Sequence, residues 1–150
     1  MPITLNLNRI WGFHVIRFHG RVTFEQLTQL GRLHQSLPSF ASADAIHVID
    51  ENADLSALLT EHVDTLREHY ATLQRSIDFY MVRRAAWVCG TVEACRIVER
   101  WLAGRHSRDG QGTEVCLAAS LAEITPLFSE EEIDAVERWS DFTELARIDD

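Results

Sequence analysis

The sequence contains no lysine: its 14 basic residues are all arginines, set against 23 acidic residues. The absence of lysine excludes catalysis through a Schiff-base lysine. The formal net charge of −9 disfavours binding to nucleic acid or to an anionic membrane surface, because both need clustered positive charge. We therefore expect no nucleic-acid partner.

Long apolar runs are missing as well. The longest run, at residues 85–89, is far shorter than the roughly 20 residues that a membrane-spanning helix needs. The first residues do not combine a basic segment with a following apolar stretch. We expect no membrane span, no secretory signal and a cytoplasmic location.

Cysteine and histidine occur without the spacing of a metal site. Three cysteines form no CxxC pair, so we expect them to be reduced and buried, although a catalytic thiolate stays an alternative. Of the seven histidines, only His14 and His47 fall on predicted strands that can be neighbours and so face one cavity. We expect no metal and no cofactor.

The composition is typical of one folded domain. Of the 150 residues, 46% are hydrophobic and 25% are charged. Alternating apolar residues at 3, 5 and 7 predict a first strand, and residues 11–18, rich in aromatic and β-branched side chains, predict a second. The short link between them predicts an antiparallel hairpin.

Strands and helices alternate after the hairpin. Apolar runs predict strands at residues 45–49, 85–89 and 113–117. Helices with one apolar face are predicted to begin at Thr23, at Ser56 or Thr60, and after Gly90 and Thr91. Because helices that separate strands imply parallel crossovers, we predict an α/β fold with a mixed sheet covered by helices.

The last part of the chain is acidic. Capping-box spacing at residues 120–123 and 129–132 predicts two short helices. We assign residues 1–128 to the α/β domain and residues 129–150 to an acidic helical extension packed on it. From Glu123 onward ten acids accompany two arginines. They form either a solvated helical face or a surface that docks a basic partner.

Two tryptophans lie in charge-rich segments that are predicted to be helical. Trp101 and Trp139 either pack in the core or mark an apolar contact patch on the surface.

The turn at Gly90 and Thr91 leads from a predicted strand into a predicted helix. The first N–H groups of a helix have no partner within the helix and can hold an anion. Gly90 and Thr91 are therefore ligand-binding candidates.

The order of elements and four segments resemble a STAS-type domain, the class named for sulfate transporters and anti-sigma-factor antagonists. The segments are ITLNLNRIWGFHVIRFHGRVT, HVIDENADLSALLT, RRAAWVCGTVEA and VCLAASLAEITPLF. The resemblance covers residues 3–128 and is especially close to bacterial STAS-like proteins often grouped with CRAL-TRIO lipid-transfer domains. It implies a non-enzymatic regulatory module with a protein partner, able to form a homodimer.

One turn of this family carries its switch. In the anti-sigma-antagonist branch, D-x-S-x-x-D-S-S-G holds a phosphorylated serine at the start of the second helix. Matching this motif places Asp54 and Ser56 on its first and third positions, and Thr60 and Glu61 on its two serines. Leu59 replaces the second acid, and a histidine replaces the glycine. The resemblance implies Ser56, Thr60 and Glu61 as interaction or switch residues, whereas a plain polar helix start is the alternative.

Three functions stay open at this point. The first is a non-enzymatic regulatory or protein-interaction module of STAS-like type. The second is a carrier or sensor of a small apolar ligand or lipid, bound in a pocket under the helices. The third is an enzyme whose site lies near Gly90, Thr91 and the predicted loop at residues 105–108. The sequence contains no known catalytic motif that favours the third.

Overall fold

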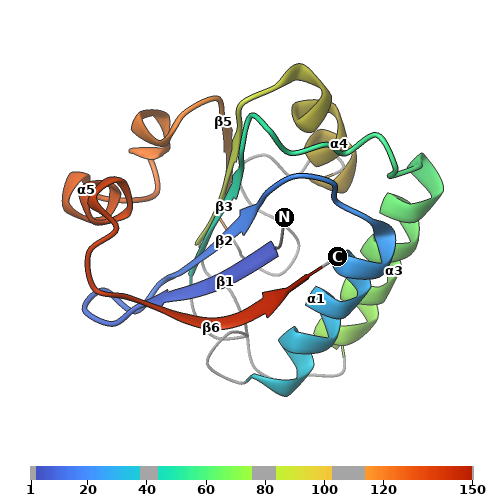
Figure 1. The fold of residues 1–150 in the computed structure, drawn as a ribbon, viewed down its shortest axis with the longest axis horizontal. Coiled ribbons are helices and arrows are strands. Elements are labelled where there is room, and N and C mark those ends of the chain that lie inside the picture. The colour runs from blue at the N-terminus through green and yellow to red at the C-terminus, as the bar shows by residue number, and fades with distance from the viewer. Residues whose placement is uncertain (1–2, 38–43, 76–83, 103–113, 150) are drawn as a thin grey trace.

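The computed structural model describes residues 3–37, 44–75, 84–102 and 114–149. They form an α/β fold built on a six-stranded mixed sheet (Figure 1), which confirms the predicted fold class. The strands are β1 (Ile3–Asn8), β2 (His14–Phe18), β3 (Ala45–Ile49), β4 (Arg84–Cys89), β5 (Glu114–Ala118) and β6 (Phe142–Ile148). Their order is β5-β4-β3-β2-β1-β6, with β2 to β5 parallel and β1 antiparallel to both β2 and β6.

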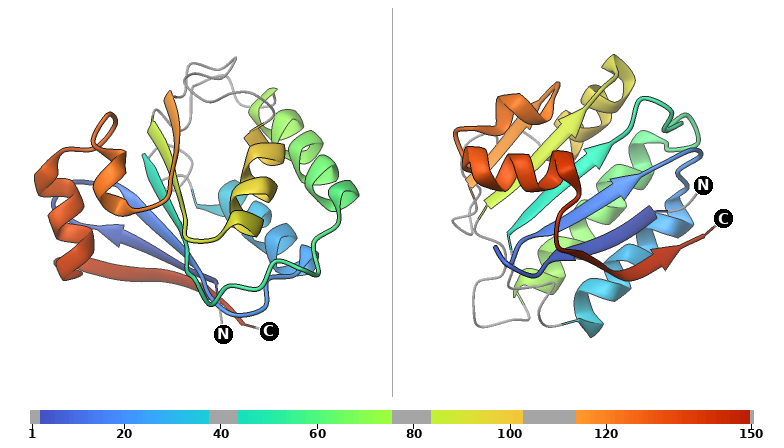
Figure 2. Two further views of the ribbon diagram at one scale, coloured as in Figure 1. Left: turned by 90° about the horizontal axis from the view of Figure 1, so that it is seen from above. Right: turned by 60° about the vertical axis from the view of Figure 1, so that its left-hand side comes forward.

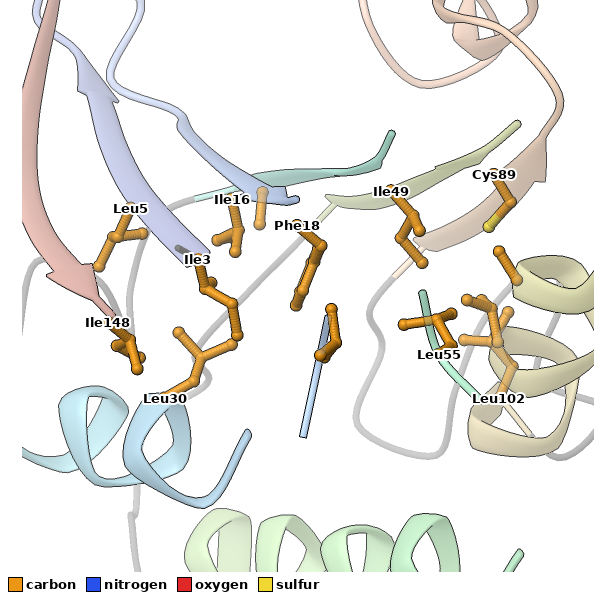
Figure 3. Close-up of a cluster of buried hydrophobic side chains, with 14 of the residues drawn as sticks. Ile3, Leu5, Ile16, Phe18, Leu30, Ile49, Leu55, Cys89, Leu102 and Ile148 are labelled. Carbon is orange, nitrogen blue, oxygen red and sulfur yellow. The ribbon is translucent and has the colours of Figure 1, made fainter. Parts of the chain in front are cut away.

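Helices cover both faces of the sheet, as Figure 2 shows. One face packs against α1 (Phe24–Ser36), α3 (Thr60–Arg75) and α4 (Val92–Leu102), and the other packs against the 3₁₀ helix η1 (Leu121–Ile124) and α5 (Glu130–Arg138). The first face buries a cluster that includes Phe18, Leu30 and Leu102 (Figure 3). Within the described residues, every helix is too short or too polar to serve as a membrane span.

Two of the predicted helix starts are confirmed in atomic detail. Thr23 caps α1: its side chain accepts from the Gln26 N–H, and the Gln26 side chain accepts from the Thr23 N–H. Ser129 and Glu132 make the same reciprocal pair at α5. The capping box predicted at residues 120–123 is wrong. A capping box there would need the Ser120 N–H to donate to the Glu123 side chain, but the Ala119 N–H donates to it instead. The segment forms a 3₁₀ helix.

The helical extension predicted for residues 129–150 is correct only in its first half. α5 ends at Arg138, and the chain then forms β6, which joins the sheet beside β1. A β-bulge shifts the pairing register between Leu5 and Asn6, so the inward side of β6 changes along the strand. This irregularity hides the two-residue period from which a strand is predicted, because it leaves apolar residues three apart.

Arg84, the first residue of β4, joins three segments at the end of the sheet where the parallel strands begin. Its Nε donates to Asp44 at 2.7 Å, and one Nη donates to the Leu127 carbonyl at 2.7 Å. The guanidinium also makes two bonds, of 3.0 and 3.1 Å, to the carboxylate of Glu132. Burial raises the pKa of Glu132, but hydrogen bonds from Arg84 and Ser129 outweigh it and leave that pKa below its usual value.

Candidate functional site

Three parallel strands end side by side and bring the residues that follow them to one edge of the sheet. The register of β2, β3 and β4 makes Phe18, Ile49 and Cys89 neighbours, so the residues after them share that edge. In open α/β sheets, ligands bind outside the carboxyl ends of the strands. We call it the carboxyl-end surface and define it by ten residues: His19, Asp50, Glu51, Ser56, Leu59, Thr60, Glu61, Gly90, Thr91 and Val92.

The side chains of His19 and Asp50 meet at this edge. His19 Nδ1 lies 2.5 Å from Asp50 Oδ2, and the two side chains are 19% and 29% exposed. The backbone supports the pair, because the Asp50 N–H donates to the Phe18 carbonyl at 3.2 Å. This pair was not predicted from the sequence. The signal was present, since each residue directly follows one of two strands predicted to be parallel.

Gly90 and Thr91 lie beside Glu51. A Cβ placed on Gly90 would be 3.0 Å from the Glu51 Cγ, so the glycine lets the two turns approach closely. The Thr91 hydroxyl accepts from the Ala94 N–H at 3.2 Å and thereby caps α4. Together with Glu93 in the first turn of α4, Glu51 makes this helix start negative. The field there opposes an anion, and ligand binding by Gly90 and Thr91 stays a prediction.

Backbone contacts fix the turn that follows β3. The Asp54 N–H donates to the Gly20 carbonyl at 2.6 Å, and the Val22 N–H donates to the Asp54 carbonyl at 2.9 Å. Leu55 is buried in the core under the sheet (Figure 3). Hydrogen bonds from the side chain and the backbone N–H of Ser56 lower the pKa of Asp54. The turn is therefore held in place before any partner binds.

The three residues implied by the family motif are all exposed on this turn or just after it. Ser56 lies in the turn, Thr60 begins α3, and Glu61 lies in its first turn. Ser56 or Thr60 was predicted to cap this helix, but Thr60 is its first helical residue and Leu59 holds the cap position. The imidazole of His62 caps the helix by accepting from the Leu59 N–H at 3.0 Å.

Two aliphatic side chains are exposed among these polar residues. Leu59 is 53% exposed at the start of α3, and Val92 is 70% exposed at the start of α4. The His62 ring stacks on Phe24, with centroids 4.6 Å apart, and so fixes the start of α3 against α1. The carboxyl-end surface thus combines ordered backbone, hydroxyl groups, acids and exposed aliphatic carbon.

Two histidines lie on the sheet face that α3 and α4 cover. His14 pairs with Ala45 across β2 and β3, and His47 is two residues further along β3, so both belong to the same face. His14 is fully buried, and burial lowers its pKa to about 4. The His47 ring stacks on Trp87, with ring centroids 3.8 Å apart. Among the described residues, His, Cys, Asp and Glu form no group of three that could hold a metal ion.

The cysteines lie in apolar surroundings. Cys89 is buried, and burial is the main cause that raises its pKa to about 12. Burial also raises the pKa of Cys116. Both shifts oppose a thiolate at neutral pH. The loop at residues 105–108, part of the predicted enzyme alternative, lies outside the described residues.

Comparisons with known proteins supply no further assignment. No protein-family model matches the chain, no curated protein matches it, and no solved structure matches it. The likeness to STAS-type domains, and with it the roles of Ser56, Thr60 and Glu61, therefore stays a prediction.

Proposed function

We propose that this chain is a STAS-like regulatory module that binds a protein partner through the carboxyl-end surface. One observation carries the proposal: the turn after β3 is fixed by the Asp54 backbone and buried Leu55, yet it presents Leu59, Thr60 and Glu61 to solvent. A surface that is ordered before binding loses little conformational entropy when a partner docks. Its exposed side chains then contribute more of their contact energy to affinity.

Phosphorylation of Thr60 is the regulatory step that this placement favours. Thr60 is exposed at the start of α3, where the helix dipole favours a phosphate, although Glu61 in the same turn opposes it. A phosphate would add a charge of roughly −2 beside Leu59 and Glu61. That charge would weaken a contact that depends on apolar Leu59, so modification would release the partner.

A photo-crosslinking amino acid tests the surface directly in the source cells. We would place it at position 59, and at position 99 in α4, an exposed site outside the carboxyl-end surface, as the control. The proposal predicts a discrete crosslinked partner from position 59 and none from position 99. Equal yields of the same partner from both positions, or no crosslink from position 59, would overturn it.

A carrier of a small apolar ligand is the second candidate, favoured by a set of aromatic rings between the sheet and α3 and α4. Trp87 stacks on His47, and its ring centroid lies 6.4 Å from that of Trp101. The centroid of the Trp101 ring lies in turn 5.2 Å from that of Tyr70. Both tryptophans are only half-buried, although helices cover this face. Rings with remaining accessible surface suit an apolar ligand.

Native mass spectrometry of the protein purified from its own cells tests the carrier. A mass excess equal to one lipid or metabolite would support it. A clean mass of the bare chain would contradict it and leave the interaction module as the proposal.

A further inference from the structure

Two turns far apart in the sequence are joined at the opposite end of the sheet. The β1–β2 turn and the α5–β6 turn lie side by side (Figure 1) and meet through buried Asn8. Its Oδ1 accepts from the N–H groups of Ile10 and Trp11 at 3.0 and 2.8 Å, and its Nδ2 donates to the Ser140 carbonyl at 3.0 Å. The Arg9 N–H also donates to the carbonyl of residue 141 at 3.0 Å. The two turns therefore form one ordered surface.

Large apolar side chains are exposed on both turns. Ile10 is 68% exposed and Trp11 is 49% exposed on the hairpin, and Trp139 is 39% exposed where α5 ends. Trp139 stacks on Phe142 with ring centroids 4.1 Å apart, and the Arg17 guanidinium lies 4.4 Å from its ring. Exposed tryptophan held in a fixed position is characteristic of the residues that dominate binding energy at protein interfaces.

The backbone of Trp139 is unfavourable for a tryptophan. It has φ 55° and ψ 48°, the left-handed conformation that glycine usually supplies after a helix. Residues with a Cβ adopt this conformation at a cost in free energy, and such costs are concentrated at functional sites. Glycine would end the helix more cheaply, so the tryptophan side chain has a role that helix termination does not explain.

Acidic side chains lie along α5, which ends at this aromatic surface. Between residues 129 and 141 there are six acids and one arginine. Glu132 pairs with Arg84, and Asp134 pairs with Arg138. The other four acids are exposed: Glu130, Glu131, Glu137 and Asp141. We call the two turns together with these four acids the hairpin-end surface. It also includes exposed Arg9 of the β1–β2 turn, but the four acids outnumber this basic side chain.

We propose that the hairpin-end surface binds a basic peptide segment, one that carries arginine or lysine together with an apolar side chain. The exposed acids match cationic side chains in charge, and the exposed Trp11 ring offers both apolar contact and cation–π attraction. The Trp139 ring already meets Phe142 and the Arg17 guanidinium, so it adds apolar contact. The partner is thus a protein segment of positive charge. This surface lies at the other end of the sheet from the carboxyl-end surface, so the two proposals stand independently.

A random peptide library displayed on phage tests this proposal. We would select it against the wild-type chain, after removing clones that also bind a Trp11→Ala variant. The enriched peptides are expected to carry net positive charge and at least one large apolar residue. No enrichment, or enriched peptides that are neutral or acidic, would overturn the proposal.

Variants then locate the binding site. Trp139→Gly keeps the left-handed turn but removes the ring, so an enriched peptide should bind it at least tenfold more weakly. Glu131→Arg and Glu137→Arg should each weaken binding, and the loss should shrink at high salt. Leu59→Ala, at the carboxyl-end surface, is the matched control and should bind as the wild type does. Equal affinity for wild type and Trp139→Gly would overturn the proposal.

Sedimentation of the free chain tests the other occupant of this surface, a second copy. The proposal predicts that wild type and Trp11→Ala have the same oligomeric state at every concentration. A dimer that is lost in Trp11→Ala would assign the hairpin-end surface to self-association and contradict a basic partner.

Discussion

The two ends of the sheet are held together in different ways. Where the parallel strands begin, buried and half-buried polar side chains join segments that are distant in sequence: Arg84 reaches Glu132, and Asn8 reaches Ser140. Where the strands end, His19 and Asp50 also join distant segments, but the fully exposed side chains are held by near neighbours, as in the contact of Asp54 with Ser56. Substitution at the first end therefore endangers the fold. The second end can change its surface chemistry at little cost in stability, which suits a surface that selects a partner.

Removal of Arg84 should have the largest effect. Arg84→Leu leaves Glu132, whose side chain is 8% exposed, without its ion-pair partner. Loss of one member of such a pair costs about 3–5 kcal/mol of unfolding free energy. Denaturant titration measures this loss. The double variant Arg84→Leu/Glu132→Leu should recover part of it, and a single variant that loses less than about 1 kcal/mol would contradict the network.

Protonation of His14 should give the next largest effect. His14 ionises near its usual pKa of 6.5 in the unfolded chain but only at about 4 in the folded one, so acid favours unfolding. As pH falls from about 6.5 to about 4, this group should remove about 3 kcal/mol of stability.

The His14→Leu variant isolates this contribution. Its unfolding free energy should fall less between pH 7 and pH 4 than that of the wild type, since all other titrating groups are shared. Parallel pH profiles for the two proteins would mean that buried His14 does not account for the acid sensitivity.

Substitution of Asn8 should cause the third-largest loss of stability. Asn8→Ala removes one acceptor and one donor that fix two turns, and we expect a loss of about 2 kcal/mol in thermal or denaturant unfolding. Asn8→Asp keeps the acceptor for Ile10 and Trp11 but cannot donate to Ser140. The introduced carboxylate is buried and faces the Ser140 carbonyl oxygen, so this variant should lose at least as much stability as Asn8→Ala, and a smaller loss would show that the Ser140 contact matters little.

The carboxyl-end surface should show the smallest changes in stability. Ser56→Ala and Thr60→Ala remove exposed hydroxyls, so each should change the unfolding free energy by less than about 0.5 kcal/mol. If either variant were destabilised as strongly as Asn8→Ala, the contrast between the two ends would be wrong.

Local patterns in the sequence predicted most of the fold. The helix start at Thr23 and the capping box at Ser129 depend on residues three apart, so spacing alone was sufficient to find them. The strand β6 was missed because a bulge opposite Leu5 and Asn6 removes its regular period. Pattern reasoning has no access to such an irregularity, which is set by pairing with a strand more than 130 residues away.

The contacts at the two surfaces also differ in whether the sequence could predict them. His19 and Asp50 could have been paired from the predicted order of parallel strands, because both follow strands that lie side by side. The contact between Asn8 and Ser140 could not, since nothing local marks two turns as neighbours. The left-handed backbone of Trp139 was equally hidden, because the sequence offers no glycine at that position.

Partner binding by two charge-reversal variants tests the central claim most directly. Glu61→Arg alters the carboxyl-end surface, and Glu99→Arg makes the same change of charge at an exposed site in α4. With the partner crosslinked from position 59 in hand, titration calorimetry would measure both affinities. The account predicts at least a tenfold loss for Glu61→Arg and little change for Glu99→Arg. Equal affinities for the two variants would contradict it.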